Sequence, residues 1–138
     1  ADTAVNVDGA TGNVDSHINT RPVKLEVCSG AGEWAVAQAR CDTESDWVAL
    51  ELRHDRAYQI FTKAVFANVR NLGILCGDAM QILPNHIMSD SVSQLFVNHP
   101  EPPQQTGGGG ESQSSHLLDQ NFFIEANRII QPEGMLTI

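Results

Sequence analysis

The chain has 138 residues and carries 17 acidic against 8 basic side chains, for a formal net charge of -9. This length is typical of one domain with its own core, and the acidic balance argues against autonomous, phosphate-driven binding of nucleic acid. No apolar stretch approaches the ~20 residues that a transmembrane helix needs. Three cysteines without close pairing indicate a reducing compartment, so we expect a cytoplasmic or nuclear protein.

The chain begins with a polar segment and then alternates strand and helix signals. Residues 1–21 are rich in Asp, Asn, Thr and Gly, which predicts a flexible leader before a domain at 22–138. Strands are expected at Val23–Val27, Trp47–Leu50, Leu72–Cys76 and Val92–Val97, and from Gly134 to Ile138. Helices alternate with them: the first begins at Glu33 and runs to Ala39, and the third is a short helix at Met80–Leu83 that stops at Pro84. The second helix has Ala57, Ile60, Phe61, Ala64, Val65 and Asn68 on one face, and the fourth has Phe122, Phe123, Ala126, Ile129 and Ile130 on one face, with Asp119 as its cap.

This alternation predicts an α/β fold, with a doubly wound, mostly parallel sheet between two layers of helices. Ligands of such sheets bind outside the carboxyl ends of the strands, so the residues after each strand are the candidates for a site. A Pro-, Gly- and Ser-rich segment at 100–115 interrupts the rhythm and is expected to be a flexible loop.

A glycine-rich loop follows the first expected strand. Glu26 lies near the end of that strand, and Gly30 and Gly32 follow it closely. Glycines have no Cβ atom, so a ligand can approach their backbone. With Ala35, the two glycines also satisfy the G-x-G-x-x-A pattern of nicotinamide cofactors, but Glu26 would repel a pyrophosphate. The loop therefore favours a cationic nucleoside such as S-adenosylmethionine, and a glycine turn beside a solvated carboxylate is the alternative.

Polar residues also follow the later strands. Glu51 comes about 20 residues after the glycines, where a carboxylate accepts hydrogen bonds from ribose hydroxyls. Asp78 follows the third strand and suits either an adenine amino group or the cap of the next helix. Asn98 and Glu101 follow the fourth strand, and Glu101 is the only carboxylate there. A surface charge at Glu51 and an ordinary proline-rich turn around Glu101 are the alternatives.

The histidines and cysteines do not suggest a metal site. The five histidines lack the spacing of metal ligands, and no two cysteines are close enough for a zinc site. We therefore expect no metal.

Four motifs in order resemble the tRNA (guanine-N7-)-methyltransferases, a branch of the class I S-adenosylmethionine-dependent methyltransferases. The motifs are Leu25-Glu26-Val27 with Gly30-Ala31-Gly32-Glu33, then Ala49-Leu50-Glu51-Leu52-Arg53, then Asn71-Leu72 with Cys76-Gly77-Asp78-Ala79, and finally Phe96-Val97-Asn98 with Pro100-Glu101-Pro102. The resemblance covers residues 23–138 and implies a Rossmann-like methyltransferase fold whose last strands are missing here.

The resemblance also implies a chemistry and the residues that carry it. It implies methyl transfer from S-adenosylmethionine to N7 of a guanine in tRNA, with Glu101 beside the reacting methyl group. The cofactor contacts that it implies are Glu26, Gly30, Gly32, Glu51, Asp78, Ala79 and Asn98. Because the chain is acidic, we expect tRNA to bind through a basic partner subunit. An unpaired fifth strand would also favour self-association.

The chain departs from the family's pattern at a few positions. Cys28 stands where the family usually has glycine, and Glu101-Pro102-Pro103-Gln104-Gln105 stands where the family has Asp-Pro-Trp-Pro-Lys. These departures leave two alternatives open: a methyltransferase-like binding module with weak or no activity, and, less favoured, an NAD-dependent oxidoreductase.

Overall fold

The computed structural model describes residues 21–98, 100 and 117–138. The expected leader, apart from Arg21, and the expected loop at 100–115, apart from Pro100, lie outside the described residues, as does Glu101. The elements in chain order are β1 (Val23–Val27), α1 (Glu33–Cys41), β2 (Asp46–Glu51), α2 (His54–Phe66), β3 (Leu72–Cys76), α3 (Ala79–His86), β4 (Val92–Val97), α4 (Gln120–Ile129) and β5 (Ile130–Thr137).

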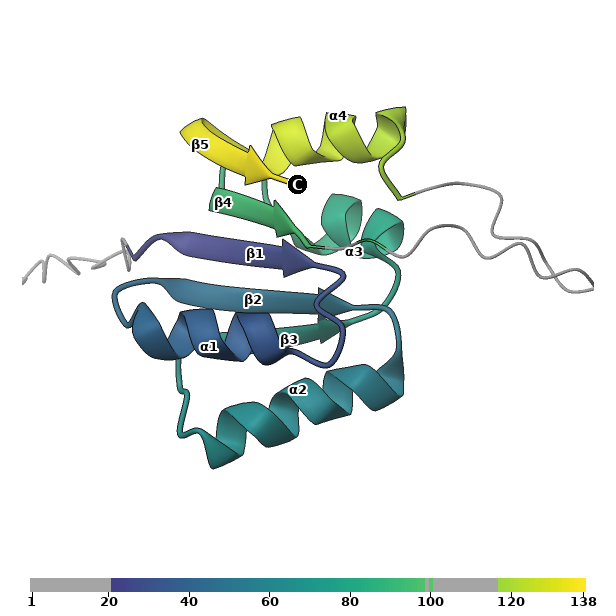
Figure 1. The fold of residues 1–138 in the computed structure, drawn as a ribbon. Coiled ribbons are helices and arrows are strands. Elements are labelled where there is room, and N and C mark those ends of the chain that lie inside the picture. Colours follow the sequence, from purple (N-terminus) through teal and green to yellow (C-terminus); the bar gives the residue numbers. More distant parts are fainter. Residues whose placement is uncertain (1–20, 99, 101–116) are drawn as a thin grey trace, which may run out of the picture.

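The strands form one parallel sheet in the order β3-β2-β1-β4-β5. All five arrows point the same way in Figure 1, so the carboxyl ends of the strands share one edge. The chain moves outward from β1 to β2 and β3, and then returns to the other side of β1 for β4. The expected doubly wound parallel sheet is confirmed.

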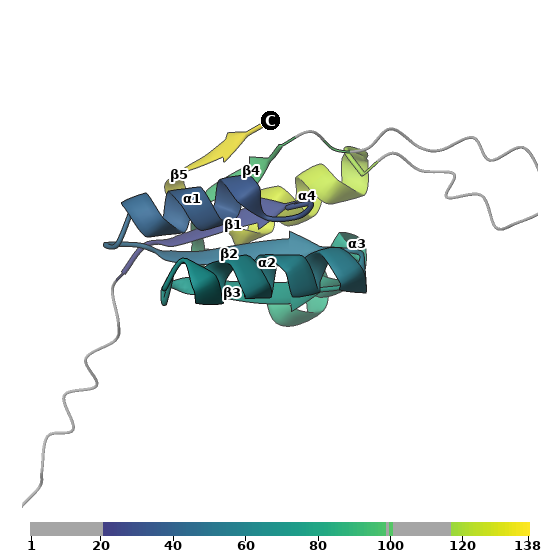
Figure 2. The same ribbon diagram turned by 60° about the horizontal axis from the view of Figure 1, so that its bottom comes forward.

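Helices cover both faces of the sheet, α1 and α2 on one and α3 and α4 on the other (Figure 2). Side chains alternate along each strand, so each face has its own apolar cluster. The cluster under α3 and α4 is the larger and contains Leu25, Val27, Leu50, Leu83, Val92, Leu95, Val97, Phe122, Ala126 and Ile129. The cluster under α1 and α2 is built from smaller residues, Ala35, Val36, Ala49, Ile60 and Ala64. Because Leu25 and Val27 face α3 and α4, the Glu26 between them faces the α1 side.

Two helices begin as the sequence predicts. Asp78 caps α3 by accepting a hydrogen bond from the amide of Met80 at 2.9 Å. Asp119 caps α4 by accepting one from the amide of Phe122 at 2.8 Å. Such caps satisfy amide groups that the first turn of a helix leaves unpaired.

The predicted apolar face of α2 is wrong in part. Ala57, Ile60 and Ala64 are buried, whereas Phe61 and Val65 are 56% and 59% exposed. Each residue turns a helix by about 100°, so Phe61 lies one step beyond the narrow stripe that contacts the sheet.

The helix predicted to stop at Pro84 continues through it to His86. Pro84 has no amide hydrogen and removes one helical bond. The last turn is nevertheless held, because the side-chain amide of Asn85 donates to the carbonyl of Gln81 at 2.7 Å and the amide of Ile87 donates to that of Leu83. Local contacts therefore offset the missing donor.

Strand β5 begins at Ile130, directly after α4, and not at the predicted Gly134. Its pairing shifts between Val92↔Ile130 and Gln94↔Met135, so the strand bulges between these two pairs. Glu133 adopts a φ of 67°, and a Cβ atom on Gly134 would lie 2.5 Å from Ile130 Cγ2. The bulge therefore requires glycine at position 134, because any larger residue would clash with Ile130.

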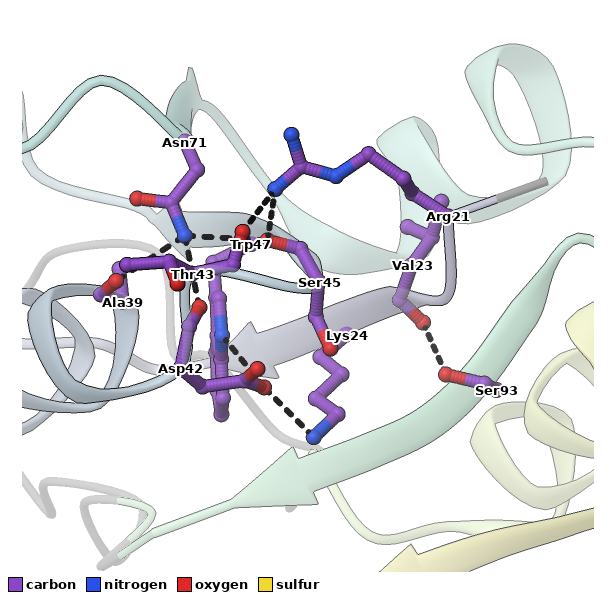
Figure 3. A network of polar contacts seen from close by, with 10 residues as sticks. All are labelled: Arg21, Val23, Lys24, Ala39, Asp42, Thr43, Ser45, Trp47, Asn71 and Ser93. Carbon is purple, nitrogen blue, oxygen red and sulfur yellow. Dashed lines mark hydrogen bonds and ion pairs between the residues drawn. The ribbon is translucent and has the colours of Figure 1, made fainter. Parts of the chain in front are cut away.

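The amino-terminal edge of the sheet is held by a polar network (Figure 3). The side-chain amide nitrogen of Asn71 donates to the carbonyls of Ala39, Asp42 and Ser45 at 2.8–3.0 Å. The Asp42 carboxylate accepts from Lys24 at 2.7 Å and from the Trp47 indole at 3.3 Å. These bonds fix the connection between α1 and β2. Across the described residues, no helix is long and apolar enough to cross a membrane.

Candidate ligand site at the carboxyl edge of the sheet

The candidate site lies where the strand order changes direction, at the ends of β1 and β4 and of their neighbours. Along the edge β3-β2-β1-β4, the polar residues at or near the strand ends are Asp78, Glu51, Glu26 and Asn98, of which Glu26 is the last residue but one of β1. The parallel register brings these four residues, from segments between positions 26 and 98, to one edge of the sheet. Doubly wound sheets bind their ligands at such a switch point.

The loop between β1 and α1 is folded by its own backbone. The amide of Ser29 donates to the carbonyl of Leu50 at 3.2 Å, and the amide of Gly32 donates to that of Ser29 at 3.0 Å. Gly30 and Gly32 both have positive φ, 58° and 83°. A Cβ atom on Gly32 would lie 2.6 Å from Ile60 Cγ1, whereas one on Gly30 would meet no atom within 4 Å. Gly32 thus serves close packing against α2, and Gly30 leaves open space for a ligand.

Glu51 joins the glycine loop to β2. Its Oε2 accepts a hydrogen bond from the amide of Gly30 at 2.7 Å, and its Oε1 accepts one from the amide of Arg53 at 3.1 Å. Its backbone carbonyl also accepts from the amide of Gly77 at 2.9 Å, which ties in the loop after β3. Each carboxylate oxygen can accept two hydrogen bonds, so both retain capacity for a hydroxyl donor.

Glu26 is buried with one oxygen poorly satisfied. Its side chain is 2% exposed, and Oε1 accepts a hydrogen bond from the Asn98 side chain at 2.9 Å. Oε2 is buried as well, and no donor within the described residues reaches it. A buried carboxylate oxygen without a donor costs free energy, so it marks a place where a cation or another donor fits.

The electrostatics of the site favour a positively charged ligand. Glu26 and Glu51 are the two buried carboxyl groups in the described part of the chain. Burial raises the pKa of Glu26 above its ordinary value, and the charge of Glu51 adds to this, while contacts with Asn98 and Ser29 act in the opposite direction. Two buried carboxylates close together are stabilised by a nearby positive charge.

Asp78 and Ala79 lie at the far end of this edge. The Asp78 side chain is exposed while it caps α3, so one carboxylate serves the helix and still faces solvent. Ala79 is buried in the apolar cluster under α3 and α4. A ligand would therefore contact Ala79 through its backbone.

The structure reveals supports that the sequence did not predict. The Lys63 ammonium donates to the carbonyl of Ala31 at 2.8 Å and forms an ion pair with Glu33, so α2 holds the end of the glycine loop. Cys28 adopts a φ of 63°, a conformation that favours glycine. The only signal for this strain was the glycine that the resembling family has there. Lys63 is 32 residues from Ala31, so local patterns could not reveal their contact.

A thiol and an imidazole lie beside Glu51. The Cys76 Sγ atom is 3.3 Å from His54 Nδ1, and Cys76 pairs with Glu51 across the sheet. In the ranges that the structure describes, no three His, Cys, Asp or Glu side chains are placed to hold a metal ion.

The fold defines the class of Rossmann-like α/β domains to which the methyltransferases belong. A solved methyltransferase from Aquifex aeolicus superposes with a TM-score of 0.61 at 16% identity, over 80% of this chain and 52% of its own. A geranyl diphosphate C-methyltransferase from Streptomyces coelicolor, solved with S-adenosyl-L-homocysteine, gives 0.63 at 16% identity, over 84% and 36%.

The chain belongs to the protein family described as "Putative methyltransferase", which matches residues 20–138. Its curated relatives include tRNA (guanine-N(7)-)-methyltransferases. The Chlamydia abortus relative is 31% identical over 120 residues, and the Chlamydia muridarum relative is 35% identical over 121. Each alignment covers 87% of this chain and 52% of the relative. The chain thus spans about half the length of these curated relatives.

Proposed function

We propose that this domain binds S-adenosylmethionine and transfers its methyl group to N7 of a guanine in tRNA. The observation that carries the proposal is the buried Glu26, whose Oε2 finds no donor among the described residues at the switch point of the sheet. The family match and the names of the curated relatives support the reaction and its acceptor.

The residues present fit this cofactor. Glu26 suits the ammonium group of its methionine part, and Glu51 has acceptor capacity for two ribose hydroxyls. Asp78 suits the adenine amino group, with the backbone of Ala79 beside it. Gly30 leaves the loop open for the ligand's approach, and Gly32 and Asn98 hold the loop and Glu26 in place.

The proposed reaction requires alignment more than proton transfer. The cofactor supplies an electrophilic methyl group on a sulfonium sulfur. Guanine N7 attacks with a free lone pair, the carbon–sulfur bond breaks with its electrons retained on sulfur, and no proton has to leave first. The domain therefore gains most from fixed geometry and matched charge at the acceptor. We assign this positioning to Glu101, which lies outside the described residues.

Two other functions are less favoured. A binding module without activity is consistent with the unusual residues at Cys28, Pro103 and Gln105, but the carboxylates Glu26 and Glu51 are retained and buried. An NAD-dependent oxidoreductase matches the glycine spacing, but the pyrophosphate would approach the buried carboxylate of Glu26.

Partners and location follow from the same proposal. A tRNA substrate places the protein inside the cell, in agreement with the three free cysteines. The net charge of -9 favours a basic partner subunit that helps to hold tRNA. In the described sheet β5 lies at one edge, and self-association through it remains a prediction.

Transfer of labelled methyl groups to unmodified tRNA tests the proposal, with the full-length protein alone and with candidate basic partners. Glu101→Ala is expected to lower turnover strongly while binding of S-adenosylhomocysteine is retained. Glu111→Ala removes a second carboxylate from the same stretch of sequence and serves as the matched control. No transfer by the wild-type protein under any of these conditions would refute the activity, and unchanged turnover in Glu101→Ala would remove Glu101 from it.

A further inference from the structure

We infer that a groove at the amino-terminal edge of the sheet, opposite the proposed cofactor site, binds phosphate groups of the RNA backbone. The groove has a volume of about 330 Å³ and lies between the end of α1, the segment after α2 and the residues before β1. Three arginines line it: Arg40 on the last turn of α1, Arg70 after α2, and Arg21 before β1. This inference rests on the proposed function, because it takes RNA as the substrate.

The distribution of ion pairs singles out this groove. The chain has only eight basic side chains. Ion pairs in the described residues join Arg21 to Asp46, Lys24 to Asp42, Arg53 to Asp55, Lys63 to Glu33, and Arg128 to Glu125, and Arg56 also has an interaction partner. Within that same part of the chain, Arg40 and Arg70 have no carboxylate partner, and both line the groove. In a chain with 17 acidic residues, two such guanidinium groups at one place form a positive site.

The arginine chemistry suits a phosphate. A guanidinium group presents a planar set of donors that matches two phosphate oxygens. Among the described residues, the only hydrogen bond of the Arg70 side chain runs from Nε to the Asn68 side-chain oxygen at 3.4 Å, so its terminal nitrogens remain available. The carboxylate in the groove, Asp46, lies 3.4 Å from Arg21 and is largely neutralised.

Opposing charges do not cancel this site. The groove lies at the carboxyl ends of α1 and α2, where each helix dipole contributes the equivalent of about half a negative charge. Two full guanidinium charges exceed that contribution. The walls are also fixed, because Asn71 binds three carbonyls and Arg21 donates to the carbonyls of Thr43 and Ser45 (Figure 3). A groove formed before binding loses little entropy when it is occupied.

The length of the sheet allows one RNA to reach both edges. A strand of six residues such as β2 spans about 20 Å. A duplex carries a phosphate charge about every 1.7 Å along its axis, so a folded RNA whose base lies at the carboxyl edge has phosphates within reach of the groove. The domain would thus bind RNA through a local cluster of arginines, although its net charge is negative.

Binding of an unmodified tRNA transcript, measured by fluorescence anisotropy over a series of salt concentrations, tests this inference in the full-length protein. Arg40→Gln/Arg70→Gln is expected to weaken binding about tenfold at low salt and to reduce the slope of log K against log [salt] by about 2. Arg40→Lys/Arg70→Lys keeps both charges and is expected to retain the slope. Thermal midpoints verify that each variant is folded.

A matched control separates a specific groove from the effect of net charge. Asn127→Asp/Gln131→Glu makes the same change in net charge at two exposed positions, one on the last turn of α4 and the other at the start of β5. It is expected to leave affinity and slope close to wild type. An unchanged slope in Arg40→Gln/Arg70→Gln, or an equal loss in the control, would overturn the inference while methyl transfer by the wild-type protein still supports the proposed function. Absence of both binding and transfer would overturn the two together.

Discussion

Glu26 is one of the two buried carboxyl groups in the described residues. Its position on β1 turns it away from the larger apolar cluster, and the α1 side of the sheet buries it. Asn98 satisfies one carboxylate oxygen, and no described donor reaches the other. The buried charge of Glu26 lowers the free energy of unfolding. Binding sites typically contain residues that lower stability in this way.

Glu26→Gln is expected to stabilise the ligand-free protein at neutral pH, because it removes a buried charge. The pKa of Glu26 is raised above its ordinary value of 4.5, so the wild type loses stability as pH rises above about 4.5 and the carboxyl group ionises. Thermal midpoints at pH 4, 6 and 8 should show the variant gaining over wild type as pH rises. Glu44→Gln, at an exposed position, is the control and should show no such trend. A variant less stable than wild type at pH 8 would contradict this interpretation of Glu26.

The two loop glycines have different roles although their sequence context is alike. Gly32→Ala would place a methyl group against Ile60 at a positive φ, so we expect a loss of stability of several kcal/mol. Gly30→Ala meets no atom, so it should cost only about 1 kcal/mol for its φ of 58°. Because the added methyl group occupies the open space, Gly30→Ala should nevertheless weaken binding of S-adenosylhomocysteine. Urea unfolding and calorimetry on both variants measure this difference. Equal stability of the two variants would contradict it.

Among the elements, the strands were predicted well and their connections less well. Short apolar runs of four to six residues indicated β1 to β4, because both faces of a parallel sheet are buried, and β2 extends one residue beyond its predicted run at each end. The bulge in β5, the continuation of α3 through Pro84 and the exposure of Phe61 were not predictable from local pattern. The bulge brings Gly134 close to the carbonyl of Ser93 on β4, and the exposure of Phe61 depends on how α2 packs against the sheet. The continuation of α3 depends on contacts within its own last turn, which the helix-breaking tendency of Pro84 conceals in the sequence.

The connection between α1 and β2 should carry an acid-sensitive part of the stability. The hydrogen bond from Lys24 and further contacts with Ser45 and Trp47 hold the pKa of Asp42 at about 2, below its ordinary 3.8. Asp42→Asn should cost about 1 kcal/mol at pH 7, since the side chains are only partly buried. Asp42 stabilises the fold above about pH 4, so the difference from wild type should vanish as pH falls from about 4 to about 2. Urea unfolding across this range measures it, and a difference that persists at pH 2 would contradict the assignment.

For the whole molecule, the order of motifs in the sequence was sufficient to predict a doubly wound parallel sheet and the edge that carries the candidate site. The alternation of strands and helices predicted that Glu26 and Glu51 share the carboxyl edge of the sheet, but their adjacency follows from the pairing of β1 with β2. Consecutive strands need not be neighbours, since β3 and β4 are separated by β2 and β1. The bond from Asn98 to Glu26 joins residues 72 apart, and that from Gly30 to Glu51 joins residues 21 apart. Neither bond leaves a local pattern, so only the folded structure shows that these residues support one another.

The residues proposed for the donor side of the reaction belong to the described part of the chain, whereas the acceptor side is proposed to involve Glu101, which lies outside it. In the proposed function, the buried carboxylates Glu26 and Glu51 would favour a cationic nucleoside over a dinucleotide. Their role does not depend on which guanine is modified, so cofactor binding can be tested without RNA.

Calorimetric titration of the full-length protein with S-adenosylhomocysteine and, separately, with NAD tests the central claim most directly. The proposed function predicts one-to-one binding of S-adenosylhomocysteine, whose ammonium group is the proposed donor for Glu26, and a large loss of affinity in Glu26→Gln. It predicts no comparable binding of NAD. Tighter binding of NAD, or unchanged binding of S-adenosylhomocysteine by a folded Glu26→Gln variant, would contradict the account.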